Sequence, residues 1–213
     1  MRQHLLPRIQ EVLKREATFL PERSDNAFSE PRLHPANGDA SAFVFFKDDR
    51  IYHHKLSRFH FTTYDVRRGT DIINPGTSHS NIMLLADNTG PAGSSSNLHP
   101  FLYARVLGTY HANVIYGGPG MTDYKARRLD FLWVRWYEVE DSGSAGWISS
   151  KLDTLHFPPM DGEFSFGFVD PDDVLRGCHI IPTFAKGKRH SDRVGVSRCA
   201  KDGNDYHQYY VGR

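Results

Sequence analysis

Hydrophobic positions follow one pattern near the start of the chain and another over the remainder. Residues 1–20 carry apolar side chains three and four positions apart, as at Leu5 and Ile9, which predicts an amphipathic helix. Residues 21–41 are rich in Pro, Ser, Asn and Asp, a composition typical of a flexible linker. We therefore expect the helix to be detached from the domain that follows.

From residue 42 onward, short alternating runs predict β-strands. The clearest run is 55–64, which places Arg58 and His60 on one face and Phe59 and Phe61 on the other. Earlier, two apolar runs flank the polar residues 47–49, where we expect a hairpin turn.

Residues 129–137 (LDFLWVRWY) form a further alternating run, with Trp133 and Trp136 on opposite faces. Beyond it, Asp170 followed by proline predicts a single helical turn. Several short strands separated by turns are typical of a small barrel or sandwich. We therefore expect one mainly β domain over 42–213, interrupted by a flexible loop at 87–100.

Composition narrows the class of protein. The 18 Gly and 12 Pro favour a turn-rich β protein, and two cysteines are too few for a disulfide scaffold. No apolar run approaches the roughly 20 residues that span a bilayer, so we expect a soluble intracellular protein without a membrane partner.

The net charge of +1 conceals an acidic segment, 138–173, followed by a basic one, 176–213. The basic segment either contacts phosphate groups or simply faces the acidic segment and water. The sequence leaves both interpretations open.

Five potential zinc ligands fall within thirty residues: Cys178, His179, His190, Cys199 and His207. None of the paired spacings of zinc-binding motifs joins them, and Cys178 precedes two isoleucines, as a buried thiol would. We therefore predict no metal and no other cofactor.

Evidence for catalysis is equally weak. Asp170, Asp172 and Asp173 offer the oxygen ligands that Mg²⁺ prefers, as in a metal-dependent nuclease, but a helix start explains them as well. Neither a nucleophile-elbow motif nor a phosphate-binding loop is present. The sequence favours a binding protein over an enzyme, assigns no catalytic residue and indicates no small-molecule substrate.

Two groups of residues are the candidates for binding. An aromatic surface that stacks bases or holds methylammonium groups is predicted at Tyr103, Trp133, Trp136 and Tyr137. Phosphate contacts are predicted at Arg67, Arg68, Lys186, Lys188 and Arg189. The alternative for the aromatic rings is that they fill the core of a small barrel.

Four segments resemble proteins encoded by Plavaka-type and related CACTA-like transposons of basidiomycete fungi. They are 64–68 (YDVRR), 99–108 (HPFLYARVLG), 132–136 (LWVRW) and 169–179 (VDPDDVLRGCH). In that family these segments lie near the C-terminus, with a transposase core upstream. The resemblance implies a transposon-derived module, with such a core as a possible partner.

A second resemblance is to bromo-adjacent homology (BAH) domains, which are chromatin-reading β-barrels. It rests on the order of 103–106 (YARV), 134–137 (VRWY) and 174–178 (VLRGC). This resemblance implies a small BAH-like barrel with short helical turns, and histone tails as ligands.

Together, these observations predict a nuclear, non-catalytic, transposon-derived module that contacts chromatin or nucleic acid, with duplex DNA or histone tails as partners. The alternatives are a remnant of a metal-dependent nuclease or transposase, and a degenerate copy without a selected function.

Overall fold

The computed structural model describes residues 1–19, 40–62, 67–86, 99–119, 121, 123–140, 152–162 and 164–212. Its helical elements are α1 (Arg2–Phe19), η1 (Ala40–Phe43), η2 (Pro171–Asp173), η3 (Phe184–Lys186) and η4 (Asp202–Asn204). Its strands are β1 (Val44–His54), β2 (Ser57–Thr62), β3 (Arg68–Ile73), β4 (Asn81–Leu85), β5 (Phe101–Tyr116), β6 (Arg127–Val139), β7 (Thr154–His156), β8 (Phe166–Val169), β9 (Val174–Gly177), β10 (His179–Pro182) and β11 (Tyr209–Gly212). The chain is mainly β, as its sequence predicts.

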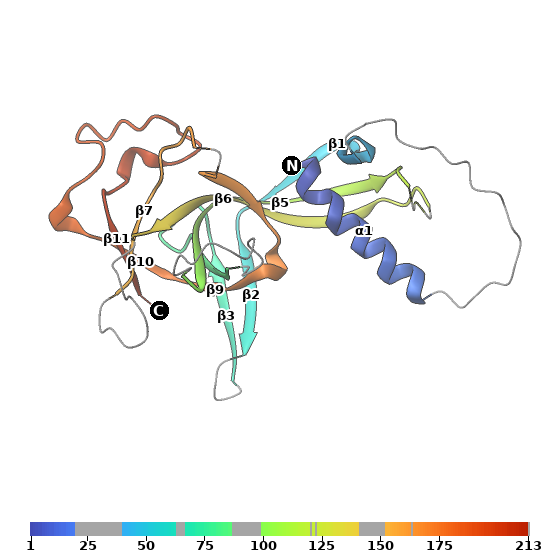
Figure 1. Ribbon diagram of the computed structural model, residues 1–213, viewed down its shortest axis with the longest axis horizontal. Coiled ribbons are helices and arrows are strands. Elements are labelled where there is room, and N and C mark those ends of the chain that lie inside the picture. Colours follow the sequence, from blue (N-terminus) through green and yellow to red (C-terminus); the bar gives the residue numbers. More distant parts are fainter. Residues whose placement is uncertain are drawn as a thin grey trace, which may run out of the picture. The chain divides into compact units, whose positions relative to one another are not determined.

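Nine strands belong to one sheet, which runs in the order β10-β11-β7-β6-β5-β4-β9, with β1 added on β5 and β8 on β6. The described strands form no closed barrel, because β10 and β9, which end this order, are not paired with each other. The mainly β class is therefore confirmed, whereas a BAH-like barrel is not. Strands β2 and β3 form a separate two-stranded sheet (Figure 1).

The described chain divides into two compact units. Unit 1 comprises 1–53 and 110–130, and unit 2 comprises 54–109 and 131–213, so β1, β5 and β6 contribute to both. No helix among the described residues is long and apolar enough to cross a membrane. The predicted linker, 21–41, and the predicted loop, 87–100, fall almost wholly outside the described residues.

In unit 1, α1 is packed rather than detached, so that expectation is wrong. Leu5 and Ile9 are fully buried and Leu13 is nearly so, which gives the helix one apolar face at a helical period. On its polar side Glu16 accepts a hydrogen bond from Arg127 Nε (3.0 Å). The sequence concealed this hydrogen bond because Arg127 lies 111 residues further along the chain.

Strand β1 also differs from its prediction. The expected hairpin turn at 47–49 is absent, and the strand continues through it from Val44 to His54. Asp48 (φ 57°) and Asp49 (φ 51°) adopt the left-handed conformation within the strand. Aspartate tolerates that conformation better than most residues do, so the polar pair bends the strand without reversing it.

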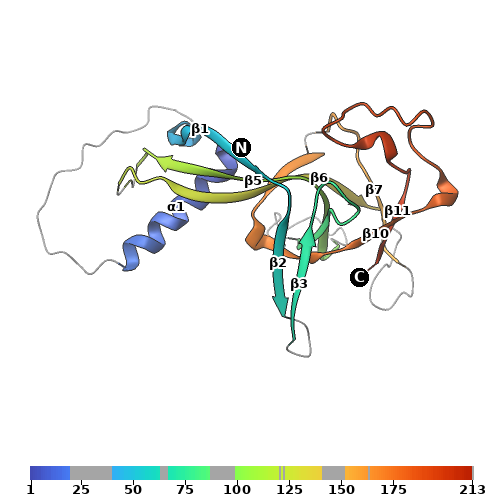
Figure 2. The ribbon, with the colours of Figure 1, turned by 180° about the vertical axis from the view of Figure 1, so that it is seen from behind.

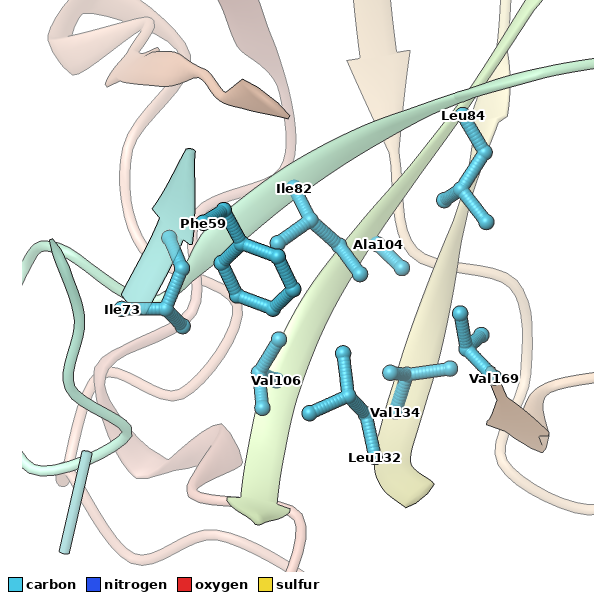
Figure 3. Close-up of a cluster of buried hydrophobic side chains, with 9 residues drawn as sticks. All are labelled: Phe59, Ile73, Ile82, Leu84, Ala104, Val106, Leu132, Val134 and Val169. Carbon is cyan, nitrogen blue, oxygen red and sulfur yellow. The ribbon is translucent and has the colours of Figure 1, made fainter. Parts of the chain in front are cut away.

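The core of unit 2 gathers apolar side chains from both of its sheets. Figure 3 shows Phe59 of β2 and Ile73 of β3 beside Ile82 of β4 and Val106 of β5. The same cluster includes Leu84, Ala104, Leu132, Val134 and Val169. The inner face of the β2–β3 hairpin is therefore anchored in the core.

A second cluster in unit 2 surrounds two arginines and one aspartate. Asp205 is completely buried, and its two oxygens accept hydrogen bonds from Arg105 Nη1 (2.6 Å) and Arg135 Nη1 (2.5 Å). The guanidinium carbon of Arg135 lies 3.9 Å from the centre of the Phe157 ring, and that of Arg105 lies 4.5 Å from it. Tyr137 stacks on the same ring at 4.0 Å.

This arrangement holds two cations against one carboxylate in the interior. Burial lowers the pKa of Arg105, but the surrounding Tyr137, Asp205 and Tyr209 raise this pKa by a larger amount. The net shift is upward, so the guanidinium stays charged. The Phe157 ring face offers further compensation through cation–π attraction. Asp205 is thus the carboxylate that pairs with both guanidinium groups of this cluster.

Asp205→Asn should therefore destabilise the protein by about 3–5 kcal/mol, because both buried guanidinium groups would lose their counter-ion. Urea unfolding followed by tryptophan fluorescence would measure the change. Asp161→Asn is the matched control, since Asp161 is exposed and its replacement should change the free energy of unfolding by less than about 0.5 kcal/mol. Equal stabilities for the two variants would contradict the proposed role of Asp205.

Ile9→Ala should lower the stability of unit 1 by about 2–5 kcal/mol, because it removes a fully buried side chain from α1. Amide hydrogen exchange of the helix would then accelerate. Arg15→Ala provides the control, as Arg15 forms only an exposed pair with Glu11. A helix that already exchanges without protection in the unmodified chain would show that α1 is not packed.

Candidate nucleic-acid interface

Two of the four residues predicted to form an aromatic surface are buried. Tyr103 is completely enclosed, and Tyr137 is 5% exposed. Tyr137 donates a hydrogen bond to Asn81 Oδ1 (3.2 Å), and burial raises the pKa of its hydroxyl. Neither ring is available to a ligand on the surface, so this part of the prediction is wrong.

The aromatic rings around Tyr137 already bind cations, but the cations belong to the protein. Arg105 and Arg135 occupy the positions over Phe157 that a methylammonium ligand would need. The bias toward aromatic residues in this region therefore reflects an internal cation–π cluster. Phe157, which receives both arginines, lies outside the alternating runs from which the sequence analysis selected its candidates.

The two tryptophans of β6 are half-buried and lie on opposite faces of the strand, as alternation predicts. Trp133 stacks on Phe166 with 6.1 Å between ring centres. Trp136 packs against the core cluster of unit 2 and covers Gly167, where an added Cβ would lie 2.6 Å from the indole nitrogen. Both rings thus pack on the neighbouring strand β8 or on the core.

The second predicted cation group, at 186–189, is partly used within the fold. Arg189 Nη2 donates to the Phe157 carbonyl (2.6 Å), and Lys188 Nζ donates to Asn204 Oδ1 (3.2 Å). Lys188 also lies over the Tyr206 ring. Lys186 is exposed on η3, so only one of these three cations is fully presented to solvent.

The first cation group lies on the β2–β3 hairpin, and here the structure adds a residue. Arg68 is exposed and pairs in register with Thr62, while Arg58 is exposed four positions earlier on β2. Arg67 is also exposed and immediately precedes β3. Within the described chain, no ion pair forms at Arg58 or Arg68.

Strand alternation separates the two faces of this hairpin. The outer face presents Arg58, His60, Thr62, Arg68, Thr70 and Ile72, whereas the inner face presents Phe59, Phe61, Asp71 and Ile73. The predicted alternation over 55–64 is confirmed for 57–62, the residues of β2. Arg58 was not among the predicted contacts, although its position on the same face as His60 was visible in the sequence.

Among the described residues of the hairpin, the acidic one, Asp71, is held on the inner face. Its Oδ2 accepts a hydrogen bond from the backbone N–H of Gly177 (2.8 Å). Arg176, next to Gly177, lies over the Phe61 ring at 5.3 Å. These contacts attach the hairpin to β9 and leave its outer face cationic.

Next to the hairpin, unit 2 contains a cavity of about 850 Å³. One wall is made of residues 70–74, from β3 and the following turn, and of Thr77 and His79 in that turn. The rest of the lining comes from Asn81 and Met83 of β4, residues 176–179 at the junction of β9 and β10, and Gly212 of β11. The turn is stabilised by Asn74, whose Oδ1 accepts a hydrogen bond from the Gly76 N–H (2.9 Å).

Cys178 lies in the wall of this cavity, between the two strands that stand at opposite ends of the sheet order. Burial raises the pKa of its thiol to about 12, so the sulfur is neutral at physiological pH. The other cysteine of the chain, Cys199, is exposed.

Neither proposed metal site assembles. Within the part of the chain that the structure describes, Cys178, His179, His190, Cys199 and His207 form no group with three ligand atoms in mutual reach. Asp170 instead caps the turn η2 by accepting from the Asp172 N–H (3.0 Å). Its role as a helix-start residue, which the sequence predicts, is confirmed.

No protein-family model matches this chain, and neither a curated protein nor a solved structure is significantly similar to it.

The environment of Cys178 generates a direct prediction about reactivity. Because the thiolate is the reactive form and the pKa is about 12, iodoacetamide at pH 8 should modify Cys178 roughly 100-fold more slowly than Cys199. Peptide mass spectrometry over a time course would give both rates in one sample. Comparable rates would contradict the burial of the Cys178 sulfur.

Proposed function

We propose that this chain is a non-catalytic nucleic-acid-binding module, in which the outer face of the β2–β3 hairpin contacts phosphate groups. The observation that carries the proposal is the presentation of Arg58 and Arg68 on one exposed face, while Asp71, the acidic residue among the described positions of the hairpin, is held on the other face. The inner face of the hairpin is anchored in the core, which holds this cationic face in place.

The dimensions of the hairpin suit a nucleic acid. Its two strands lie side by side and project from the main sheet of unit 2 (Figures 1 and 2). A two-stranded ribbon of this kind fits the major groove of B-DNA. Arg58 and Arg68 stand about four residues apart along it, or about 13 Å, so each reaches a different phosphate.

The charge of the surface favours a nucleic acid over a histone tail. Histone tails are basic, and Arg58, Arg68 and Arg176 would repel their lysines and arginines. The aromatic groups that a methyl-lysine reader needs are occupied by Arg105 and Arg135. A BAH-like reader of methylated histones is therefore less well supported than contact with DNA or RNA.

The same geometry gives little support to a nuclease remnant. Asp170 caps η2, and Asp172 and Asp173 complete that turn at the surface. A transposon origin, suggested by the resemblance of four segments, fits a module that brings a transposase core to nucleic acid. On this proposal the protein acts in the nucleus.

Removing both hairpin arginines should weaken DNA binding and reduce its dependence on salt. For the full chain carrying Arg58→Ala and Arg68→Ala, the slope of log affinity against log salt should decrease by about 2, since each phosphate contact contributes about 0.9. Fluorescence anisotropy with a labelled duplex across a salt series would measure the slope.

The matched control is Arg193→Gln with Arg198→Gln, which removes two exposed cations of unit 2 outside the hairpin. The control should keep the slope of the unmodified chain. If both double variants lose affinity equally, the hairpin has no special role. If the unmodified chain does not bind even at low salt, the proposed function is contradicted.

A further inference from the structure

We propose that the cavity beside Cys178 binds a single unpaired nucleotide and prefers bases that carry an amino group, namely adenine and cytosine. This proposal rests on the proposed function, because the cavity shares β3 with the phosphate-binding hairpin. The volume of about 850 Å³ is within the range of roughly 300–1,000 Å³ that small-ligand sites occupy.

The cavity wall includes apolar groups that suit the flat face of a base. Ile73 is 2% exposed and belongs to the core cluster. Met83 and Cys178 are half-buried and pack against the second cluster. The neutral thiol of Cys178 adds to this apolar surface, since it carries no charge that a base would have to desolvate.

Two polar groups in the wall have fixed orientations. The Asn81 oxygen accepts from Tyr137, which leaves the amide nitrogen as the group that can donate into the cavity. The Asp71 Oδ2 accepts from Gly177 N–H, which leaves its other oxygen as an acceptor. One fixed donor and one fixed acceptor complement the edge of adenine or cytosine, where an amino group lies beside a ring nitrogen.

One cation and two hydrogen-bonding side chains in the same wall suit the phosphate. Arg176, His79 and His179 line the cavity and are all exposed, and Arg176 is held in place over Phe61. A base in a duplex cannot offer its pairing edge, so the occupant must be a nucleotide of a single strand, a strand end or a flipped position.

The test uses the two cysteines of the unmodified full chain as reporter and internal control. At AMP or CMP concentrations about ten times Kd, alkylation of Cys178 should slow about tenfold, because only the unliganded fraction reacts. Alkylation of Cys199, which does not line the cavity, should keep its rate. UMP and inorganic phosphate should protect Cys178 at least about tenfold less effectively.

Asp71→Asn provides the specificity variant. The side-chain oxygen can still accept from Gly177 N–H, but the second acceptor becomes an N–H donor. Protection by AMP and CMP should therefore weaken about tenfold, toward the level that UMP gives. Asp161→Asn, an exposed isosteric change outside the cavity, should leave the protection of Cys178 by each nucleotide unchanged.

Each other outcome overturns the inference. Equal protection by inorganic phosphate would make the cavity a simple anion site, and protection by a basic peptide instead would make it a peptide site. If no mononucleotide protects Cys178 while the hairpin arginines still govern DNA binding, the cavity proposal fails and the proposed function stands. If DNA binding is absent as well, both fail.

Discussion

Unit 2 depends on an electrostatic constraint at its centre, where one buried carboxylate pairs with two guanidinium groups. Arg105 comes from β5, Arg135 from β6 and Asp205 from the segment that precedes β11, so their hydrogen bonds connect three separate parts of the chain. Phe157 lies against both cations, and Tyr137 stacks on it. Removing Asp205 would leave both guanidinium groups without the carboxylate that pairs with them.

The same constraint determines which surfaces remain for a ligand. The aromatic rings of the second cluster hold arginines, whereas the hairpin and the cavity beside it remain open to a ligand. The two faces of the hairpin have different roles. Phe59 and Ile73 bind it to the core, and Arg58 and Arg68 face outward. An anchored inner face and a charged outer face are what recognition of a polyanion needs.

Local patterns in the sequence were sufficient for local structure. Alternation places Arg58 and His60 on one face of β2, and Asp170 begins a helical turn, both as predicted. Both features depend only on neighbours in the chain. Asp48 and Asp49 show the limit of this reasoning, because a polar pair that is typical of a turn instead bends a continuous strand.

Contacts between distant residues could not be predicted in this way. Tyr103 and Tyr137 occur in runs that suit a surface strand, yet the partners that bury them lie elsewhere in the chain, as Phe157 does for Tyr137. The packing of α1 against Arg127 and the joining of β3, β4 and β9 around the cavity are of the same kind. Composition suggested a cation–π site, but only the fold shows that its cations are internal.

The position of Asp205 has a consequence for the synthesis of the protein. It follows Arg135 by 70 residues and Arg105 by 100. At a translation rate of about 5–20 residues per second, both arginines are synthesised several seconds before Asp205 is added to the chain. The centre of unit 2 must therefore close late, and until then the nascent chain carries two cations and a set of aromatic rings that a chaperone could recognise.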